Sequence, residues 1–442
     1  NDKPSTPYLA IVKKDAETNR TIPIAGATFK VKCLSDNFDF KEGDYVGWWL
    51  KYPSWRYVDE FVTGDDGTVT LPEGLPVGTY QIEEIRSPEG YLLAKTGKVF
   101  EIRQNDLYQQ TGPDEHSIIS TVLFEDTSVK GKVKVQKEAM LFKEYVSTQT
   151  EYGELFTPVY ERGLLPGVKF EIRAETDIVG ADETTWYTAG QRVAVLTTDG
   201  KTITTSGELP LGTEGHNIYS IREIETAEGY VLDDTIHYFR FDYVDGNTAI
   251  VDPTWLDEDG EVIEKAEVLT LDNKHQTSIA LAKKVMEQSD LKDKAEAYKK
   301  VVFGIFSNQV EHLEKDSLVS IVDVEEDGTA SAKLTQKGSY YLKELTTDPD
   351  YVPSAEKYPF TYTYNGDQLQ EIEVNEGKPI YNLLKRGEIE IYKQDADSKL
   401  PLKNVCFELA TDKDFTNIIK TTWTDENGKA IFGELEVNYT YY

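Results

Sequence analysis

The chain has 442 residues, of which 39% are hydrophobic and 11% aromatic, and its 79 acidic residues against 47 basic ones give a formal net charge of −32. This length is too great for one core and predicts roughly three or four domains, while the apolar content excludes a globally disordered chain. The negative charge argues against nucleic acid and anionic lipid as partners, and no apolar run reaches the roughly 18–20 residues that a membrane-spanning helix needs.

The start of the sequence and the two cysteines bear on signal-peptide processing and on disulfide bonds. Asn1 is not followed by the charged and apolar regions of a signal peptide, so we expect a mature or excised segment. Cys33 and Cys406 lie far apart and cannot form a disulfide framework.

The first recurring element is a short alternating strand that ends in a lysine on its apolar face. It reads LAIVK at 9–13, VKVQK at 133–137, IALAK at 279–283 and IEIYK at 389–393. Because successive side chains of a strand point to opposite faces, the lysine shares the side of the aliphatic residues. The four inward lysines are therefore Lys13, Lys137, Lys283 and Lys393.

An aromatic-centred strand and a turn follow each lysine. The strands are GATFKV, GVKFEI, VVFGIF and NVCFEL, and the turns contain Asp-Gly or Asn-Gly, as in GDDGTVTL and TDENGKAIF. Such turns between alternating runs are typical of β-hairpins. The recurrence predicts an array of all-β, Ig-like β-sandwich modules.

The next element places a carboxylate toward the core. In TYQIEEIRSPEGY, at 79–91, Tyr80, Ile82 and Glu84 share one face of a strand, although a buried carboxylate without a partner is costly. The same pattern in YSIREIETAEGY and YYLKELTTDPDY gives Glu223 and Glu344.

The last strand of each module ends in an amide or acid that is in step with apolar residues. These residues are Asp126, Asn273 and Asn382. In FEDT both Glu125 and Asp126 are available, but only Asp126 is in phase with the apolar residues Val122 and Phe124.

The spacing of these elements gives domain boundaries. We expect the tail of a preceding module at 1–8, with Asn1 as its terminal asparagine, and modules at 9–128, 129–275, 276–386 and 387–442. The fourth module stops before its own glutamate, so its Lys393 lacks partners. The sequence therefore reads as a window from a longer tandem array.

Two insertions and one helix interrupt the repeats. Segment 38–61 is rich in aromatic residues, and Trp48, Trp49, Tyr52, Trp55 and Tyr57 are candidates for a platform that binds a sugar or a host protein. We favour the alternative, a hairpin whose rings pack on the sheet. Segment 138–163 has the same ambiguity, and 286–300 is the best candidate for a helix.

The three inward groups can react with one another. Burial lowers the pKa of a lysine and raises that of a glutamate, so the pair can exist as a neutral amine and a neutral acid. The amine is then a nucleophile, the carboxyl carbon of the Asn or Asp is an electrophile, and the glutamate shuttles protons. The alternative interpretation is a set of inward salt bridges at strand ends.

The motifs together resemble the CnaB-type (SpaA-like, prealbumin-like) domains of Gram-positive cell-wall-anchored adhesins and pilins. The pattern begins with KKDAET at 13–18 and KQDADS at 393–398, and it continues through G-A-x-F, T-D-x-x-G and Y-x-L-x-E-x-x-x-P-x-G-Y to a terminal V/L-x-N. It covers essentially the whole chain, although ETAEGY lacks the proline, TDPDY lacks the glycine, and KKVMEQ replaces K-x-D.

This resemblance implies spontaneous intramolecular isopeptide bonds, each assisted by a glutamate. The bonds are Lys13–Asp126 with Glu84, Lys137–Asn273 with Glu223, and Lys283–Asn382 with Glu344.

The expected function is a structural stalk segment of an extracellular, cell-wall-anchored adhesin that cross-links itself once and is not an enzyme. Sortase would attach the full protein to peptidoglycan through a signal outside this segment, and we expect a monomer. The alternatives are an adhesin region that binds a host matrix protein, immunoglobulin or glycan through 38–61, and a pilin backbone, for which neither a YPK-type motif nor an LPxTG signal is present. The acidic segment 252–261 does not match an EF-hand, so we expect no metal and no cofactor.

Overall fold

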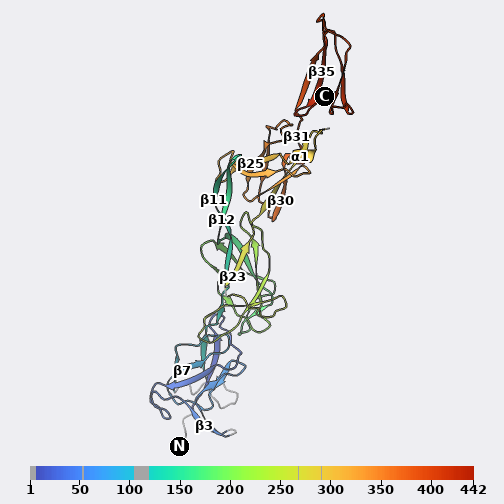
Figure 1. The fold of residues 1–442 in the computed structure, drawn as a ribbon. Coiled ribbons are helices and arrows are strands. Elements are labelled where there is room, and N and C mark those ends of the chain that lie inside the picture. Colours follow the sequence, from blue (N-terminus) through green and yellow to red (C-terminus); the bar gives the residue numbers. More distant parts are fainter. Residues whose placement is uncertain (1–5, 52–53, 104–118, 267, 290) are drawn as a thin grey trace. The chain divides into compact units, whose positions relative to one another are not determined.

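The computed structural model describes residues 6–51, 54–103, 119–266, 268–289 and 291–442, and it shows an all-β architecture (Figure 1). Over these ranges the helices are too short and too polar to cross a lipid bilayer. The chain divides into two compact units. One comprises 1–138, 164–227 and 232–273, and the other comprises 139–163, 228–231 and 274–442.

The first part of the first unit contains two sheets and a separate hairpin. The sheets have the orders β6-β1-β9 and β5-β2-β7-β8, and β3 pairs with β4. Between them lies a core that includes Ile11, Phe29, Tyr80 and Phe124. The strands are β1 (Tyr8–Asp15), β2 (Thr28–Cys33), β3 (Trp48–Lys51), β4 (Trp55–Val58), β5 (Phe61–Val62), β6 (Thr68–Thr70), β7 (Gly78–Arg86), β8 (Lys98–Ile102) and β9 (Ile119–Asp126).

The second part of the first unit repeats this plan. A five-stranded sheet has the order β16-β13-β19-β20-β22, and β11 pairs with β17 at its beginning and also pairs with β23. The strands are β10 (Lys130–Gly131), β11 (Lys134–Thr150), β13 (Pro166–Ala174), β14 (Ile178–Val179), β15 (Thr185–Tyr187), β16 (Arg192–Asp199), β17 (Thr204–Thr205), β18 (Leu209–Pro210), β19 (Tyr219–Glu225), β20 (His237–Phe241), β21 (Ile250–Val251), β22 (Pro253–Leu256) and β23 (Val268–Asn273).

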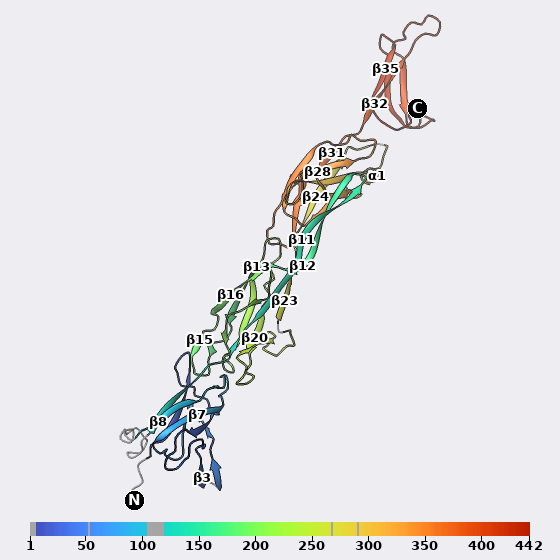
Figure 2. The same cartoon turned by 90° about the vertical axis from the view of Figure 1, so that its left-hand side faces the viewer.

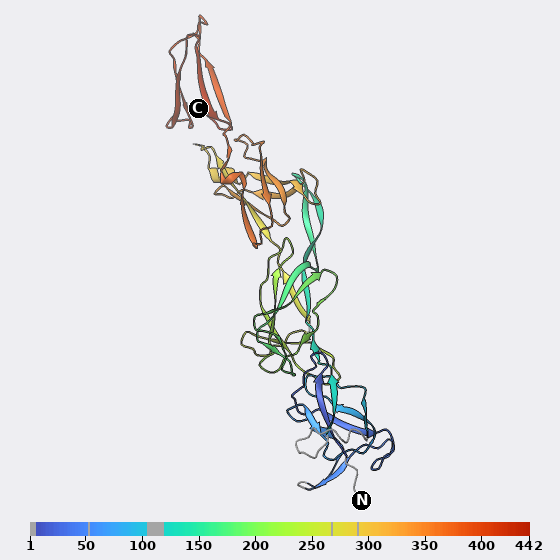
Figure 3. The same cartoon turned by 180° about the vertical axis from the view of Figure 1, so that it is seen from behind.

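The second unit begins with strands from the insertion at 138–163. The sequence repeats predict this segment as part of the second module, but residues 139–163 belong to the second unit. Within that unit, β12 (Gly153–Leu164) pairs with β26 (Leu318–Asp323) in parallel at Leu155 and Leu318. Figures 2 and 3 show the β11–β12 hairpin beside the orange strands of this unit.

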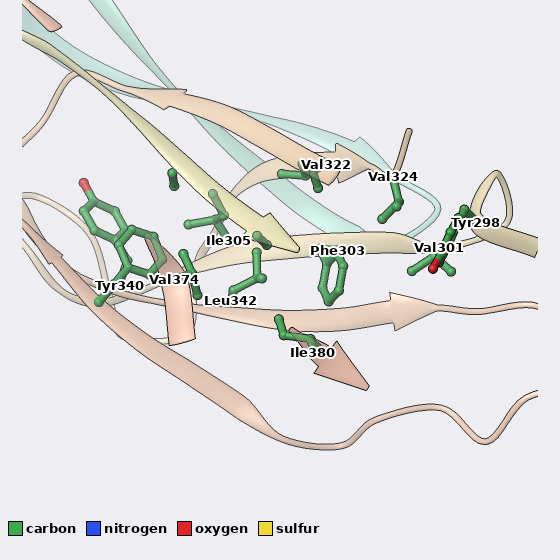
Figure 4. Close-up of a cluster of buried hydrophobic side chains, with 14 of the residues drawn as sticks. Tyr298, Val301, Phe303, Ile305, Val322, Val324, Tyr340, Leu342, Val374 and Ile380 are labelled. Atoms are coloured by element: carbon green, nitrogen blue, oxygen red, sulfur yellow. The ribbon is translucent and has the colours of Figure 1, made fainter. Parts of the chain in front are cut away.

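The remaining strands of this region form two sheets around one core. In one sheet the neighbours are, in order, β26, β25, β28 and β29. In the other, β24 lies between β27 and β30 and also pairs with β31. Phe303, Ile305 and Leu342 point toward one another in this core (Figure 4). The elements are β24 (Thr277–Met286), α1 (Lys294–Tyr298), β25 (Val302–Val310), β27 (Thr329–Leu334), β28 (Gly338–Thr346), β29 (Lys357–Tyr362), β30 (Leu369–Glu373), the 3₁₀ turn η2 (Val374–Gly377) and β31 (Ile380–Asn382).

The helix expected within 286–300 is present but short. β24 extends to Met286, and α1 begins only after Asp293, whose side chain accepts a hydrogen bond from Ala295 N at 2.9 Å. Ala297 and Tyr298 are its buried residues. The helix is therefore limited to the stretch between an N-cap aspartate and the start of β25.

The last part of the chain forms two strand pairs, β32–β35 and β33–β34. Its core is small, with Leu409, Phe432 and Leu435 buried. The strands are β32 (Arg386–Tyr392), β33 (Cys406–Ala410), β34 (Ile418–Trp423) and β35 (Lys429–Glu436).

Candidate functional site

Three glutamates lie on the inner face of a central strand, each opposite a phenylalanine. Glu84 pairs with Phe29, Glu223 with Phe170 and Glu344 with Phe303. In each pair the register shifts by a β-bulge immediately beside the phenylalanine. Because a bulge re-aims the neighbouring side chains, the three carboxylates share one local backbone geometry, which the sequence alternation did not predict.

The first site joins β1, β7 and β9. Lys13 Nζ lies 2.8 Å from Glu84 Oε1 and also contacts Asp126 Oδ2, and all three side chains are completely buried. The ammonium also lies 4.5 Å from the centre of the Phe124 ring. Glu125, the alternative to Asp126, is exposed. The structure thus brings together the predicted lysine, glutamate and aspartate.

Burial changes the acid–base properties of the first site. Loss of solvation raises the pKa of Asp126 to about 7; the charge of Lys13 opposes this rise and that of Glu84 adds to it. A carboxyl group with this pKa is protonated in a substantial fraction of molecules near neutral pH.

The second site has the same composition except for an asparagine. Lys137 Nζ lies 2.8 Å from Glu223 Oε2, and both side chains are completely buried. Asn273 Nδ2 donates to Glu223 Oε1 at 3.0 Å and to Thr226 Oγ1 at 2.6 Å. The glutamate therefore bridges the lysine and the amide with its two oxygens.

The third site corrects one sequence prediction. Lys284, not Lys283, reaches the glutamate: its Nζ donates to Glu344 Oε1 at 3.0 Å and to Asn382 Oδ1. Asn382 Nδ2 donates to the same Glu344 oxygen at 2.9 Å and to Thr347 Oγ1 at 3.0 Å. The side chain of Lys283 lies outside the described part of the structure.

The physical reason for this correction is a one-residue error in strand phase. The inward residues of β24 are Ala280, Ala282, Lys284 and Met286, which are all buried. The prediction chose Ile279 and Leu281, the larger aliphatic residues, which are only partly buried. A shift of one residue exchanges the two faces of a strand. The error in phase therefore placed Lys283 on the inner face in place of Lys284.

Burial also acts on the third site. It lowers the pKa of Lys284, although the neighbouring Glu344 carboxylate opposes this effect. The ring of Phe303 lies 5.3 Å from Nζ. The neutral amine is therefore more populated here than on an exposed lysine.

A backbone amide orients the glutamate in two of the sites. Ala94 N donates to Glu84 Oε2 at 3.0 Å, and Ser354 N donates to Glu344 Oε2. Each donor lies ten residues after its glutamate in the sequence. The amide holds Oε2 and leaves Oε1 facing the lysine; no side-chain motif could have revealed this contact.

The lysine strand and the last strand are parallel neighbours. β1 pairs with β9 so that Lys13 is opposite Phe124, two residues before Asp126. β24 pairs with β31 so that Lys284 is opposite Ile380, two residues before Asn382. The lysine and the aspartate or asparagine thus occupy the same diagonal position in both sheets.

The aromatic candidates of segment 38–61 separate into two groups. Trp48 is partly buried against Phe40 and Phe61. Trp49, Trp55 and Tyr57 expose 66%, 63% and 49% of their surface, on the outer face of the β3–β4 hairpin. The expectation that the rings pack on the sheet is therefore wrong for these three. Tyr52 lies outside the described residues.

The two candidates for an incomplete cross-link are not placed in a site. Lys393 follows β32 with its side chain exposed, and Asn1 lies outside the described residues.

A comparison with protein-family models gives one match. The SpaA model, described as a prealbumin-like fold domain, matches residues 8–116, 160–254 and 387–442, which together exceed half of the chain. No curated protein matches the sequence.

Several solved structures match this chain at low sequence identity. The Bacillus anthracis TIE protein is 21% identical with a TM-score of 0.47, covering 84% of this chain and 51% of that protein, so this chain spans about half its length. BcpA, the major pilin subunit of Bacillus cereus, is 13% identical with a TM-score of 0.31, covering 86% of this chain and 100% of that one. The full-length major pilin SpaD from Corynebacterium diphtheriae is 13% identical with a TM-score of 0.23, covering 87% and 99%.

Proposed function

Because the chain belongs to the SpaA family of prealbumin-like fold domains, we propose that it is a stalk segment of a Gram-positive surface protein, stiffened by intramolecular isopeptide bonds. The family supports a pilin or surface-stalk role and is not a family of enzymes. The observation that carries the proposal is the meeting of a lysine, a glutamate and an asparagine or aspartate in three buried sites.

The third site provides the parts for an amide exchange. The neutral Nζ of Lys284 attacks Cγ of Asn382, the Cγ–Nδ2 bond breaks, and ammonia leaves. Glu344 accepts a proton from Nζ and delivers one to Nδ2, because its Oε1 is within hydrogen-bond distance of both nitrogens. Lys137, Glu223 and Asn273 perform the same step in the second site.

The first site performs a condensation instead. The neutral Nζ of Lys13 attacks the protonated carboxyl group of Asp126, and the bond from Cγ to the hydroxyl oxygen breaks. Glu84 accepts the proton that Nζ loses and delivers a proton to the leaving oxygen, so that water leaves. The raised pKa of Asp126 supplies the protonated acid, and the completely buried setting excludes the solvent that would otherwise stabilise the ions.

Parallel pairing gives these bonds a mechanical role. The strands β1 and β9 are parallel, so the chain enters the region at the start of β1 and leaves it at the opposite end of the pair, after β9. A pull on the two ends of the region therefore shears β1 against β9. A covalent bond from Lys13 to Asp126 would carry that force between the strands. Like a disulfide, it would also restrict the unfolded chain, and it would need no oxidant.

Mass spectrometry of the intact protein tests the proposal. We expect the full chain to be lighter than its sequence mass by two ammonia molecules and one water, with cross-linked peptides at the three sites. Lys284→Ala should restore one ammonia to the mass, whereas the matched variant Lys283→Ala should not. An unmodified mass of the wild-type chain would leave three buried salt bridges and would contradict the proposal.

The exposed aromatic face supports a second candidate function, the binding of a host protein or glycan. Trp49 is opposite Tyr57, and Lys51 is opposite Trp55, so the four side chains share one face of the hairpin. Trp and Tyr side chains are frequent anchors of interfaces. A glycan and matrix-protein array probed with the full chain and with a Trp49→Ala/Trp55→Ala/Tyr57→Ala variant of unchanged circular dichroism tests this candidate. Equal binding by both proteins would exclude the hairpin as the binding site.

A further inference from the structure

A threonine lies three residues after the glutamate in each site that contains an asparagine. Thr226 follows Glu223 and Thr347 follows Glu344. Each hydroxyl accepts a hydrogen bond from the amide nitrogen of the asparagine, at 2.6 Å from Asn273 and 3.0 Å from Asn382. The recurrence in two sites shows that this contact is part of the local architecture.

The threonine completes the partners of the amide nitrogen. Nδ2 of Asn382 also donates to Glu344, and Oδ1 of the same amide accepts from Lys284. An amide nitrogen has two N–H groups, so the glutamate and the threonine together satisfy both. This arrangement presents the leaving nitrogen to the carboxyl group that protonates it and turns the carbonyl toward the lysine.

The first site is a natural comparison, because Asp126 has no amide hydrogen. Ser87 occupies the equivalent position, three residues after Glu84. Its hydroxyl donates to the backbone oxygen of Tyr91 at 3.0 Å. The hydroxyl at this position therefore contacts the reacting group only where that group is an asparagine.

We propose that Thr226 and Thr347 are positioning residues that fix the orientation of the reacting amide and hold its leaving nitrogen beside the glutamate. This inference rests on the proposed isopeptide chemistry. It concerns the step in which the Cγ–Nδ2 bond breaks and ammonia leaves, and it assigns no such role to Ser87.

The test follows the formation of each bond in the newly made full chain. The chain is synthesised in a cell-free system, samples are quenched in denaturant at timed intervals, and each cross-link is measured by peptide mapping. We expect Thr347→Val to slow the Lys284–Asn382 bond roughly fivefold or more, as the loss of one hydrogen bond predicts. Thr347→Ser should restore the rate, and Ser87→Ala should leave the Lys13–Asp126 bond unchanged.

A stability measurement separates positioning from a purely structural role. The comparison uses a Lys284→Met background, which cannot form the third bond. The thermal unfolding of this chain is measured with Thr347→Val and with Thr347 retained. Wild-type kinetics in the Thr347→Val chain, with or without a loss of stability, would overturn the inference. Absence of the ammonia loss from the wild-type chain would instead refute the proposed function itself, so the two failures are distinguishable.

Discussion

Burial acts on opposite partners of the proposed bond in the first and third sites. In the first it raises the pKa of Asp126, the electrophile, to about 7. In the third it lowers the pKa of Lys284, the nucleophile. Both changes favour neutral side chains, as expected when an ionised group loses water. The group with the shifted pKa is the acceptor in the first site and the amine in the third.

This difference predicts different pH dependences within one chain. At the first site a rise in pH from about 6 to about 8 frees the attacking amine but ionises the carboxyl group of Asp126, whose pKa is about 7, so the two effects offset and the rate of the Lys13–Asp126 bond should change little. Over the same range the neutral fraction of Lys284 increases, so the Lys284–Asn382 bond should form several-fold faster. Timed peptide mapping of the newly made chain measures both rates in each sample. Rates that change in the same proportion at both sites would show that a shared step, such as folding, is limiting.

The sequence predicted much of each site because period-two alternation is a strong signal. The inward positions of Glu84, Glu223 and Glu344 are confirmed by their burial. In β24, however, the alternation pointed to Lys283 in place of Lys284. This strand pairs with neighbours on both edges and carries apolar residues on both faces. Alternation of polarity does not distinguish the faces of such a strand.

The β11–β12 hairpin shows the limit of sequence reasoning at the scale of elements. Its strands could be recognised as an insertion, but their packing depends on contacts distant in sequence. Phe142 stacks on His312 with ring centroids 5.4 Å apart, and Tyr160 OH accepts from Gln336 Nε2 at 2.8 Å. By pairing with β26, the hairpin covers a strand edge that would otherwise be open to another chain.

This packing predicts that the hairpin stabilises the sheet it joins. Phe142→Ala removes the ring that stacks on His312, and we expect the opening free energy of β26 to fall by about 1–2 kcal/mol. Hydrogen exchange of the amides in Leu318–Asp323 measures this change. Val146→Ala on the same hairpin is the control, because Val146 is 47% exposed and its truncation should have little effect. Unchanged exchange in Phe142→Ala would show that the ring contact does not stabilise the sheet.

Across the whole molecule, the same diagonal of lysine and acceptor recurs on parallel first and last strands, at Lys13 and Asp126 and at Lys284 and Asn382. Sequence repeats predicted that these strands would meet, but parallel pairing is a property of the folded sheet. Because the strands are parallel, each proposed bond closes nearly all of its region into a covalent loop. A pull on the chain ends then passes through the bond and does not extend the loop.

Single-molecule pulling of the full chain tests this consequence. Lys284 and Asn382 are 98 residues apart, and a released loop of this size adds roughly 340 Å of contour length at about 3.5 Å per residue. We expect Lys284→Ala to show an additional unfolding event of nearly this length, reduced only by the folded separation of the two residues. The wild-type chain and Lys283→Ala should lack it, because the bond would keep the loop closed at forces that unfold ordinary β-domains. The same extension in all three proteins would mean that the chain transmits force through non-covalent contacts alone.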